Sequence, residues 1–248
     1  MADLDIVIPV YNEGANIISV LDALKRDVKS SFRILICYDF DDDNTLEAIS
    51  AYPDKSIDIV LVKNPGRGPH SAIKAGLDLV NAPAVLTHMA DDDYTTHHID
   101  YMIKKSQEGF EIVTGSRFMK GGEMKGCVWY KKFLTWLASF TLYHFARFPI
   151  QDATHGVRIF SRRILDEVRI ESDTGFTFSF EMMVKVVRLS WKIHEFPVGW
   201  YERKKGKSRF QIWKWMWPYL HWYFFAYQTA WLRKGPESVV RRKDGDTI

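Results

Sequence analysis

The stretch DIVIPVYNEGANIISVLDALKRDV (residues 5–28) changes its apolar spacing once. Its first six residues form a near-continuous apolar run, which predicts a buried β-strand. The apolar residues that follow recur at helical spacing, at Ile17, Leu21, Leu24 and Val28. A helix is therefore expected directly after the strand.

The same alternation continues along the first half of the chain. Further apolar runs predict strands at residues 33–38, 58–62, 84–89 and 111–115. Helices are expected between them, one from about Asn44 and one after residue 68. Strands of this kind alternating with helices predict an α/β fold, with a Rossmann-like, mostly parallel sheet covered by helices on both faces.

Polar segments follow four of these strands where each one ends. They are Tyr11–Glu13, Asp39–Asp43, Gly66–Gly68 and Asp91–Asp93. In open α/β sheets, ligands bind beyond the carboxyl ends of the strands. The four segments are therefore expected to converge on one rim.

The second half is richer in aromatic residues. A helix is predicted at residues 129–145, a strand within 152–160, a helix near 180–189 and a strand at 192–198. A second aromatic segment spans residues 213–232. It is long enough to cross a bilayer but contains Lys214 and Pro218, and Trp, Tyr and Phe prefer the membrane interface. We therefore expect this segment to lie on a membrane or to pack on the domain.

Composition sets broad limits on the class of protein. The chain has 248 residues, 46% hydrophobic and 26% charged, which is typical of a globular protein. A formal charge of +3 gives no reason to expect nucleic-acid binding. No signal peptide is predicted at the start, and the unlike settings of Cys37 and Cys127 favour a reducing compartment. A cytoplasmic protein, held peripherally at the inner face of the membrane, is expected.

Three aspartates stand together in HMADDDYTTHH (residues 88–98). One interpretation is a solvated acidic turn, and the other is a seat for Mg²⁺ or Mn²⁺, which bind carboxylate and phosphate oxygens. Asp91 and Asp93 are the expected metal ligands. Asp92 should point the other way in an extended chain and be solvated. The spacing of the nearby histidines does not support a closed zinc site.

A basic segment precedes the second aromatic stretch. Residues 201–209, YERKKGKSR, hold five basic side chains around a glycine. Arg203 and Arg209 are the candidates for binding a diphosphate. The other three are expected to be solvated or to contact anionic lipid.

Six motifs, taken in order, resemble one family. They are IPVYNE (8–13), the Asp39 turn, the Asp91–Asp93 triplet, GSRFMKGG (115–122), DATHGVRIF (152–160) and EFPVGWYERKKGKSRF (195–210). The chain resembles the family-2 glycosyltransferases of GT-A fold, in the dolichol-phosphate mannose synthase-like group, over about residues 4–210. The resemblance implies a GT-A domain at 1–210 that includes an amphipathic helix at 123–146. An aromatic membrane-interface helix would follow at 211–234, with a polar tail at 235–248.

The resemblance also implies roles for the donor site. Pro9, Tyr11 and Glu13 would line the nucleoside pocket, and Asp39 would accept a hydrogen bond from the base. Arg67 would cover the same nucleoside, or its turn would simply begin a helix. Asp91 and Asp93 would hold the metal on the donor diphosphate, with Arg203 and Arg209 on its other side.

On the acceptor side, Arg117 would meet the acceptor phosphate, or would serve as a structural hydrogen-bond donor. Lys131 and Thr135, one helical turn apart, would complete that seat. Asp152 and Glu181 are rim candidates without assigned roles.

Three positions depart from the family pattern. Met89 stands where relatives carry the first Asp of the metal motif, and Tyr38 and Phe40 replace Asp and Gly in the Asp39 turn. The identity of the base therefore stays open.

The expected function is an inverting glycosyltransferase that moves a hexose from GDP-mannose or a UDP-hexose to a dolichyl or undecaprenyl phosphate. A lipid phosphate is already ionised at neutral pH and needs no general base. The expected partners are the donor, the lipid phosphate, the membrane surface and a membrane partner protein, without nucleic acid. One alternative is transfer to a soluble or glycan hydroxyl, with Asp152 or Glu181 as base. Another is a non-catalytic module that binds membrane or nucleic acid.

Overall fold

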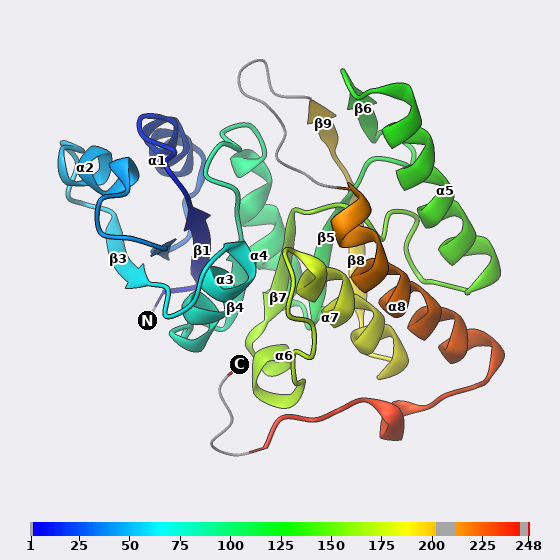
Figure 1. Cartoon of the computed structure of the whole chain (residues 1–248). Coiled ribbons are helices and arrows are strands. Elements are labelled where there is room, and N and C mark those ends of the chain that lie inside the picture. Colours follow the sequence, from blue (N-terminus) through cyan, green and yellow to red (C-terminus); the bar gives the residue numbers. More distant parts are fainter. Residues whose placement is uncertain (1, 202–211, 244–247) are drawn as a thin grey trace. The chain divides into compact units, whose positions relative to one another are not determined.

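The computed structural model describes residues 2–201, 212–243 and 248 of the chain, shown in Figure 1. The chain forms two compact units. Unit 1 comprises Met1–Gly109, Ile159–Arg169 and Arg242–Ile248, and unit 2 comprises Phe110–Arg158 and Ile170–Arg241. Arg203 and Arg209, predicted to bind the diphosphate, lie outside the described residues.

Unit 1 is built on a sheet whose first four strands are parallel. Strands β1 (Leu4–Val10), β2 (Phe32–Tyr38), β3 (Asp58–Lys63) and β4 (Ala84–Thr87) lie in the order β3-β2-β1-β4. Residues 159–161 of β7 (Arg158–Ser161) pair with β4 in the antiparallel sense. The central strands β1 and β2 are almost wholly buried, which explains their continuous apolar sequences. The predicted mostly parallel sheet is confirmed.

Helices cover both faces of this sheet, as predicted (Figure 1). The chain moves outward from β1 to β3 through α1 (Asn16–Asp27) and α2 (Asn44–Ser50), then returns to β4 through α3 (Pro69–Asp78). Parallel crossovers are right-handed, so reversing the direction places α3 on the opposite face from α1 and α2. Gly76 lets α3 approach closely, because a Cβ there would come within 2.6 Å of Val7 Cγ1.

Three short elements of unit 1 were not predicted from the sequence. They are the 3₁₀ turn η1 (Thr96–His98), the helix α4 (Ile99–Gln107) that follows it directly in the chain, and the helix α6 (Arg162–Glu167). The turn η1 contacts α1. The region just after the aspartate triplet is therefore fixed by a helix from the start of the chain.

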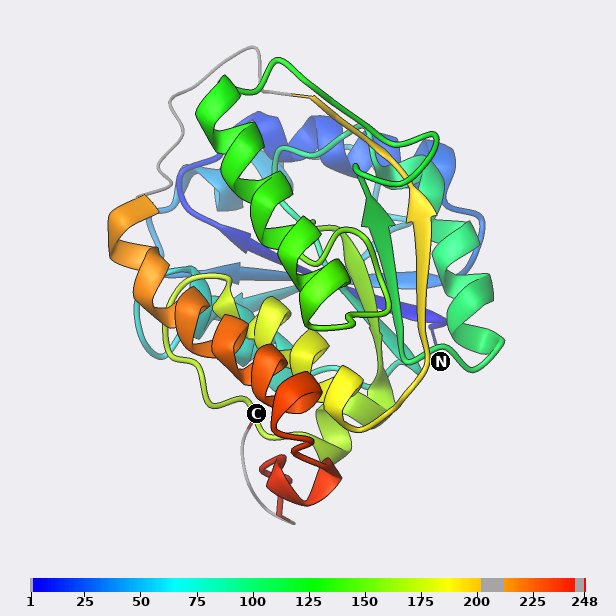
Figure 2. The same cartoon turned by 90° about the vertical axis from the view of Figure 1, so that its right-hand side faces the viewer.

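Unit 2 contains two parallel strand pairs and three long helices. β5 (Ile112–Ser116) pairs with β8 (Ile193–Pro197), and β6 (Glu123–Lys125) pairs with β9 (Gly199–Tyr201). Figure 2 shows α8 (Ile212–Trp231, orange) beside α7 (Thr177–Arg188, yellow) and α5 (Trp129–Phe145, green). The 3₁₀ turn η2 (Pro236–Ser238) follows α8. In the described part of the chain, none of the helices has the length and apolar character needed to cross a bilayer.

A buried ion pair holds the start of β1 in unit 1. The carboxylate of Asp5 is 0% exposed and accepts hydrogen bonds from Arg33 Nε (2.8 Å) and Nη2 (2.9 Å). The backbone N–H groups of Asn81 and Ala82 donate to the same carboxylate. Burial alone would raise the pKa of Asp5, but the bonds from Arg33 and the two N–H groups lower it overall. The carboxylate therefore stays ionised inside the fold.

We expect Asp5→Asn to lower the free energy of unfolding by about 3 kcal/mol, because it leaves Arg33 without its charged partner. Urea denaturation monitored by circular dichroism measures this. Asp42→Asn, an exposed carboxylate after β2, is the matched control and should change stability by less than about 0.5 kcal/mol. Equal effects from the two substitutions would contradict this account.

Candidate functional site

In unit 1, the loops that follow β1 and β2 are joined by side-chain hydrogen bonds. Asp43 is buried, caps α2 by accepting from Thr45 N (2.9 Å), and accepts from Asn12 N (3.0 Å) with its other oxygen. The hydroxyl of Thr45 in turn accepts from Glu13 N (3.0 Å). These bonds fix both loops at the carboxyl ends of adjacent strands.

The predicted nucleoside-binding residues lie on these joined loops. Tyr11 is exposed, and its ring meets that of Phe40 edge to face, with centroids 5.3 Å apart. Pro9 and Glu13 are half-buried on the β1 side. The structure therefore brings Pro9, Tyr11 and Glu13 together beside Asp39, as parallel pairing of β1 with β2 requires.

Asp39 accepts hydrogen bonds from the turn at residues 64–68. Its Oδ1 accepts from Asn64 Nδ2 (2.6 Å) and its Oδ2 accepts from Gly68 N (2.8 Å). Asn64, which is buried, also accepts from Gly66 N (3.0 Å). Gly68 has φ of +84°, a conformation that favours glycine, and it precedes Pro69 at the start of α3. Arg67 lies exposed in this turn, which both begins a helix and places Arg67 near Asp39.

The expectation that Asp92 is solvated is wrong. Asp92 is buried, and its carboxylate accepts from Thr95 N (3.0 Å) and from the Thr95 hydroxyl (2.6 Å). The expectation assumed an extended chain, but β4 ends at Thr87 and the chain turns, with Asp92 N donating to Met89 O (3.3 Å). Asp92 therefore builds the turn that precedes η1.

The other two aspartates of the triplet have different surroundings. Asp91 is half-buried and Asp93 is exposed. Arg26 in the last turn of α1 has its pKa raised, first by Asp27 and to a lesser extent by the charge of Asp93. Asp93 therefore lies within the field of a cation, which partly offsets its negative charge.

Potential metal ligands are sparse in the described residues, where no group of three or more His, Cys, Asp or Glu could hold a metal ion. The rings of His97 and His98 are in contact, with centroids 3.9 Å apart and planes tilted by 43°. Burial lowers the pKa of His98 to about 4. A Mg²⁺ or Mn²⁺ ion here would take Asp91 and Asp93 together with phosphate oxygens of a ligand, a donor set that suits both ions.

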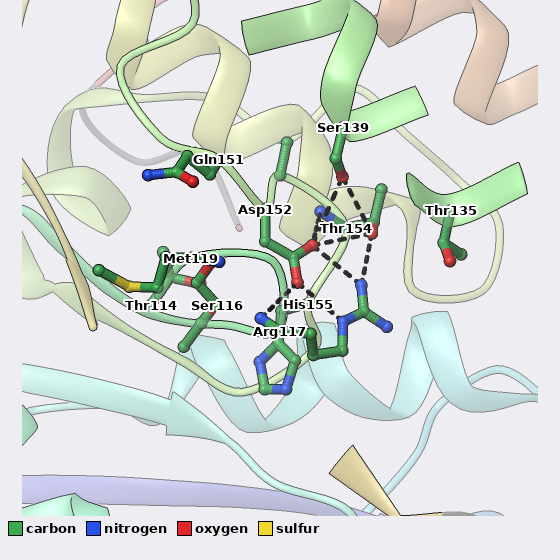
Figure 3. A network of polar contacts seen from close by, with 12 residues as sticks. Thr114, Ser116, Arg117, Met119, Thr135, Ser139, Gln151, Asp152, Thr154 and His155 are labelled. Atoms are coloured by element: carbon green, nitrogen blue, oxygen red, sulfur yellow. Dashed lines mark hydrogen bonds and ion pairs between the residues drawn. The ribbon is translucent and has the colours of Figure 1, made fainter. Parts of the chain in front are cut away.

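Unit 2 contains a buried polar network around Arg117 and Asp152, drawn in Figure 3. Arg117 donates from Nε to Asp152 Oδ2 (2.7 Å), and from Nη2 to Asp152 Oδ1 (2.9 Å) and Thr154 Oγ1 (2.6 Å). The Arg117 backbone N–H donates to the same carboxylate (3.0 Å). Glu195 on β8 accepts hydrogen bonds from the backbone N–H groups of Gln151 and Asp152. These bonds hold the loop that carries Asp152 against β8.

The charges in this network compensate each other. Burial would raise the pKa of Asp152, but the hydrogen bonds and charge of Arg117 lower it well below its usual range. Next to them, burial and the charge of Arg117 lower the pKa of His155 to about 4, and its neutral Nδ1 accepts from Val157 N. The contacts of Arg117 are therefore those of a structural hydrogen-bond donor. Its role toward an acceptor phosphate remains a prediction.

Glu181 is also engaged inside unit 2. It is 0% exposed and accepts from Glu171 N (2.7 Å), Ser172 N (2.8 Å) and Lys185 Nζ (2.6 Å). Asp152 is equally buried. The structure therefore places both carboxylates in the interior of unit 2 rather than on a rim.

The predicted acceptor residues on α5 lie one turn apart, as expected. Lys131 is half-buried, and the Thr135 hydroxyl donates to the backbone carbonyls of Lys131 (2.9 Å) and Lys132 (3.0 Å). Lys132 Nζ reaches Met124 O of β6 (3.4 Å). The first turn of α5 thus carries two cations and no acidic residue.

Many aromatic side chains of α5 and α8 are exposed to solvent. Exposed rings include Trp129 (76%), Phe133 (50%), Trp217 (71%) and Trp231 (67%). Polar groups join the two helices: Tyr223 OH meets Thr141 Oγ1 (2.6 Å), and Tyr227 OH donates to Thr141 O (3.0 Å). This link was not predicted from the sequence, although Tyr223 and Tyr227 stand four residues apart on one helix face.

The chain is similar in sequence to glycosyltransferases. A model of the family described as Glycosyl transferase family 2 matches residues 5–169. A dolichyl-phosphate hexose transferase of Haloferax volcanii is 25% identical over 207 residues, covering 81% of this chain and 84% of the relative. A polyprenol monophosphomannose synthase of Mycolicibacterium smegmatis is 24% identical over 213 residues, covering 82% and 79%.

The fold also matches solved structures. Glucosyl-3-phosphoglycerate synthase from Mycobacterium tuberculosis, in complex with Mn²⁺, UDP and glucosyl-3-phosphoglycerate, aligns with a TM-score of 0.61 at 17% identity. The alignment covers 83% of this chain and 73% of that one. The likeness confirms the predicted GT-A fold class.

We expect Arg117→Met to lower the free energy of unfolding by about 3 to 5 kcal/mol, because it strands the buried Asp152 carboxylate. The double variant Arg117→Met, Asp152→Asn should recover part of this loss. Lys120→Met, an exposed cation three residues along, serves as control. Additive single effects would rule out the coupling.

The same ion pair predicts a pH dependence of stability. The pKa of Asp152 is lower in the folded chain than its unfolded value of about 3.9. Its stabilisation is therefore present above about pH 4 and is lost as the pH falls toward the folded-state pKa. Unfolding free energy measured from pH 7 to pH 3 should fall less steeply in Asp152→Asn than in the parent chain.

Proposed function

Since the chain belongs to glycosyl transferase family 2, we propose that it is an inverting enzyme that moves a hexose from a nucleotide sugar to a polyprenyl phosphate. Two relatives aligned over about four fifths of this chain are named dolichyl-phosphate hexose transferase and polyprenol monophosphomannose synthase. The choice of acceptor rests on the burial and hydrogen bonding of the Asp152 and Glu181 carboxylates. Both carboxylates are buried and engaged by internal donors.

A hydroxyl acceptor must lose a proton during transfer, and it therefore needs a general base. The pKa of Asp152 is held low by Arg117, which makes this carboxylate a weak base, and Glu181 is bound by Lys185 and two backbone N–H groups. A phosphate monoester, with a second pKa of about 6, is already largely ionised at neutral pH. The geometry therefore favours a dolichyl or undecaprenyl phosphate over a soluble or glycan hydroxyl.

On the donor side, Asp91 and Asp93 are proposed to hold a Mg²⁺ or Mn²⁺ ion that also binds the donor diphosphate. The ion would stabilise the negative charge that develops on the departing diphosphate. Pro9, Tyr11 and Glu13 are proposed to line the nucleoside pocket, with Arg67 beside it. GDP-mannose and a UDP-hexose are the proposed donors, and Arg203 and Arg209 remain predicted diphosphate ligands.

In unit 2, the exposed aromatic faces of α5 and α8 support peripheral membrane binding. Trp, Tyr and Phe prefer the headgroup layer, and the lysines of the first turn of α5 suit anionic lipid phosphates. We propose that the chain works at the inner, cytoplasmic face of a membrane, alone or with a membrane partner protein. Residues 1–210 are the proposed catalytic domain, 211–234 the interface helix and 235–248 the tail.

We expect Asp91→Asn to lower the transfer rate by about 100-fold and Asp93→Asn by a smaller factor, since Asp93 is exposed and lies in the field of Arg26. The assay incubates labelled nucleotide sugar with polyprenyl phosphate and Mn²⁺, then counts the label extracted into organic solvent. Asp58→Asn, an exposed carboxylate where β3 begins, at the opposite edge of the sheet, is the control and should keep the parent rate.

Two results in that assay would contradict the proposal. A parent chain that gives no lipid-extractable label with any GDP- or UDP-hexose would exclude the acceptor class. Full activity of Asp91→Asn with excess chelator would exclude the metal.

We expect Trp129→Ser, Phe133→Ser to weaken binding to phosphatidylglycerol vesicles by at least about 10-fold, because two exposed rings would no longer enter the interface. Vesicle co-sedimentation measures the bound fraction. Tyr101→Ser removes an exposed ring from α4 of unit 1 and should leave binding unchanged. Unaltered binding by the double variant would assign the aromatic face another role.

A further inference from the structure

Two aromatic rings stand at the ends of adjacent strands in unit 1. Tyr11 follows β1 and Phe40 follows β2, with ring centroids 5.3 Å apart and an interplanar angle of 81°. Tyr11 is 49% exposed and Phe40 is half-buried, so ring surface remains accessible on the side where ligands bind in such sheets. Flat aromatic side chains here can receive a flat ligand ring.

The positions of both rings are set before any ligand arrives. The register pairs Val10 with Tyr38, so the two loops begin side by side. Asp43 then ties the loops together through Asn12 N (3.0 Å), and its own N–H donates to Phe40 O (3.2 Å). A preorganised pair of rings loses little conformational freedom when a ligand binds.

Asp39, between these rings in sequence, already has a structural task. One carboxylate oxygen accepts from Asn64 Nδ2 (2.6 Å) and the other from Gly68 N (2.8 Å). Asn64 is itself held by Ser71 Oγ (2.6 Å) and by its own backbone N–H on Tyr38 O (2.8 Å). These contacts commit one acceptor site on each carboxylate oxygen to the turn at residues 64–68. Asp39 therefore has a structural task whichever base is bound, and the two rings are the other groups at these strand ends that can contact a base.

We propose that Phe40 is a nucleoside-binding residue of the donor site, and that Tyr11 and Phe40 bind the nucleoside by ring contact rather than through hydrogen bonds to the edge of its base. This inference builds on the proposed function, because it assumes a nucleotide-sugar donor. Every base has a π face, so stacking on an aromatic side chain tolerates different bases. The chain should therefore accept both purine and pyrimidine nucleoside diphosphates.

The test is calorimetric titration of the full-length chain with UDP and with GDP, each with Mg²⁺. The two dissociation constants should agree within about 10-fold. Phe40→Leu keeps an apolar side chain but removes the ring, and it should weaken both nucleotides by a similar factor of about 10. Phe40→Tyr keeps the ring and should bind both as the parent does. Asp39→Asn should alter both constants by the same factor.

The outcomes separate this inference from the proposed function. A parent that prefers one nucleotide by more than about 100-fold, with the preference lost in Asp39→Asn and untouched in Phe40→Leu, would overturn the inference and leave the transferase proposal intact. Binding of neither nucleotide by the folded parent would overturn both. Thermal unfolding of each variant confirms that a lost titration signal reflects the site rather than the fold.

Discussion

Parallel pairing of β1 with β2 is the constraint on which the proposed nucleoside-binding surface depends. Parallel strands that begin at one edge of a sheet end together at the other, so the loops after Val10 and Tyr38 start as neighbours. The hydrogen bonds from Asn12 N and Glu13 N to Asp43 and Thr45 then join loops 31 and 32 residues apart in sequence. Without this register, residues 9–13 and 39–45 could not form one surface.

Buried carboxylates in this chain organise backbone more than they perform chemistry. Asp5 holds two N–H groups and Arg33, Asp152 holds Arg117 and its own loop, and Glu181 holds two N–H groups and Lys185. A carboxylate is removed from water at a cost, and each of these recovers that cost through several charge-assisted bonds. Asp91 and Asp93 are more accessible than these three carboxylates. Burial thus separates structural from candidate catalytic acids.

The fold could be predicted from the spacing of apolar residues along the chain, whereas the burial and hydrogen-bond partners of individual polar residues could not. Apolar runs and helical repeats are local properties, and they located β1 to β5 and the aromatic helix α5 correctly. The environment of Asp92 depends on a turn that begins where β4 ends, and that of Asp152 depends on Arg117, 35 residues earlier. Such pairings arise only in the folded chain. The sequence left two roles open for Arg117, contact with an acceptor phosphate or structural hydrogen bonding, and the contacts with Asp152 and Thr154 are of the structural kind.

The helix pair α5 and α8 connects the aromatic composition of unit 2 with the proposed acceptor. Aliphatic helices could bury themselves in hydrocarbon, but Tyr223 and Tyr227 carry hydroxyls that bond to Thr141, and Trp231 Nε1 donates to Phe145 O (2.8 Å). These bonds satisfy the polar ends of rings whose remaining surface is apolar, which is what an interface between water and lipid demands. A polyprenyl phosphate has the same division, with an ionised head and an apolar chain. A protein surface that matches both parts can bind the phosphate head group at the interface while the protein stays outside the bilayer.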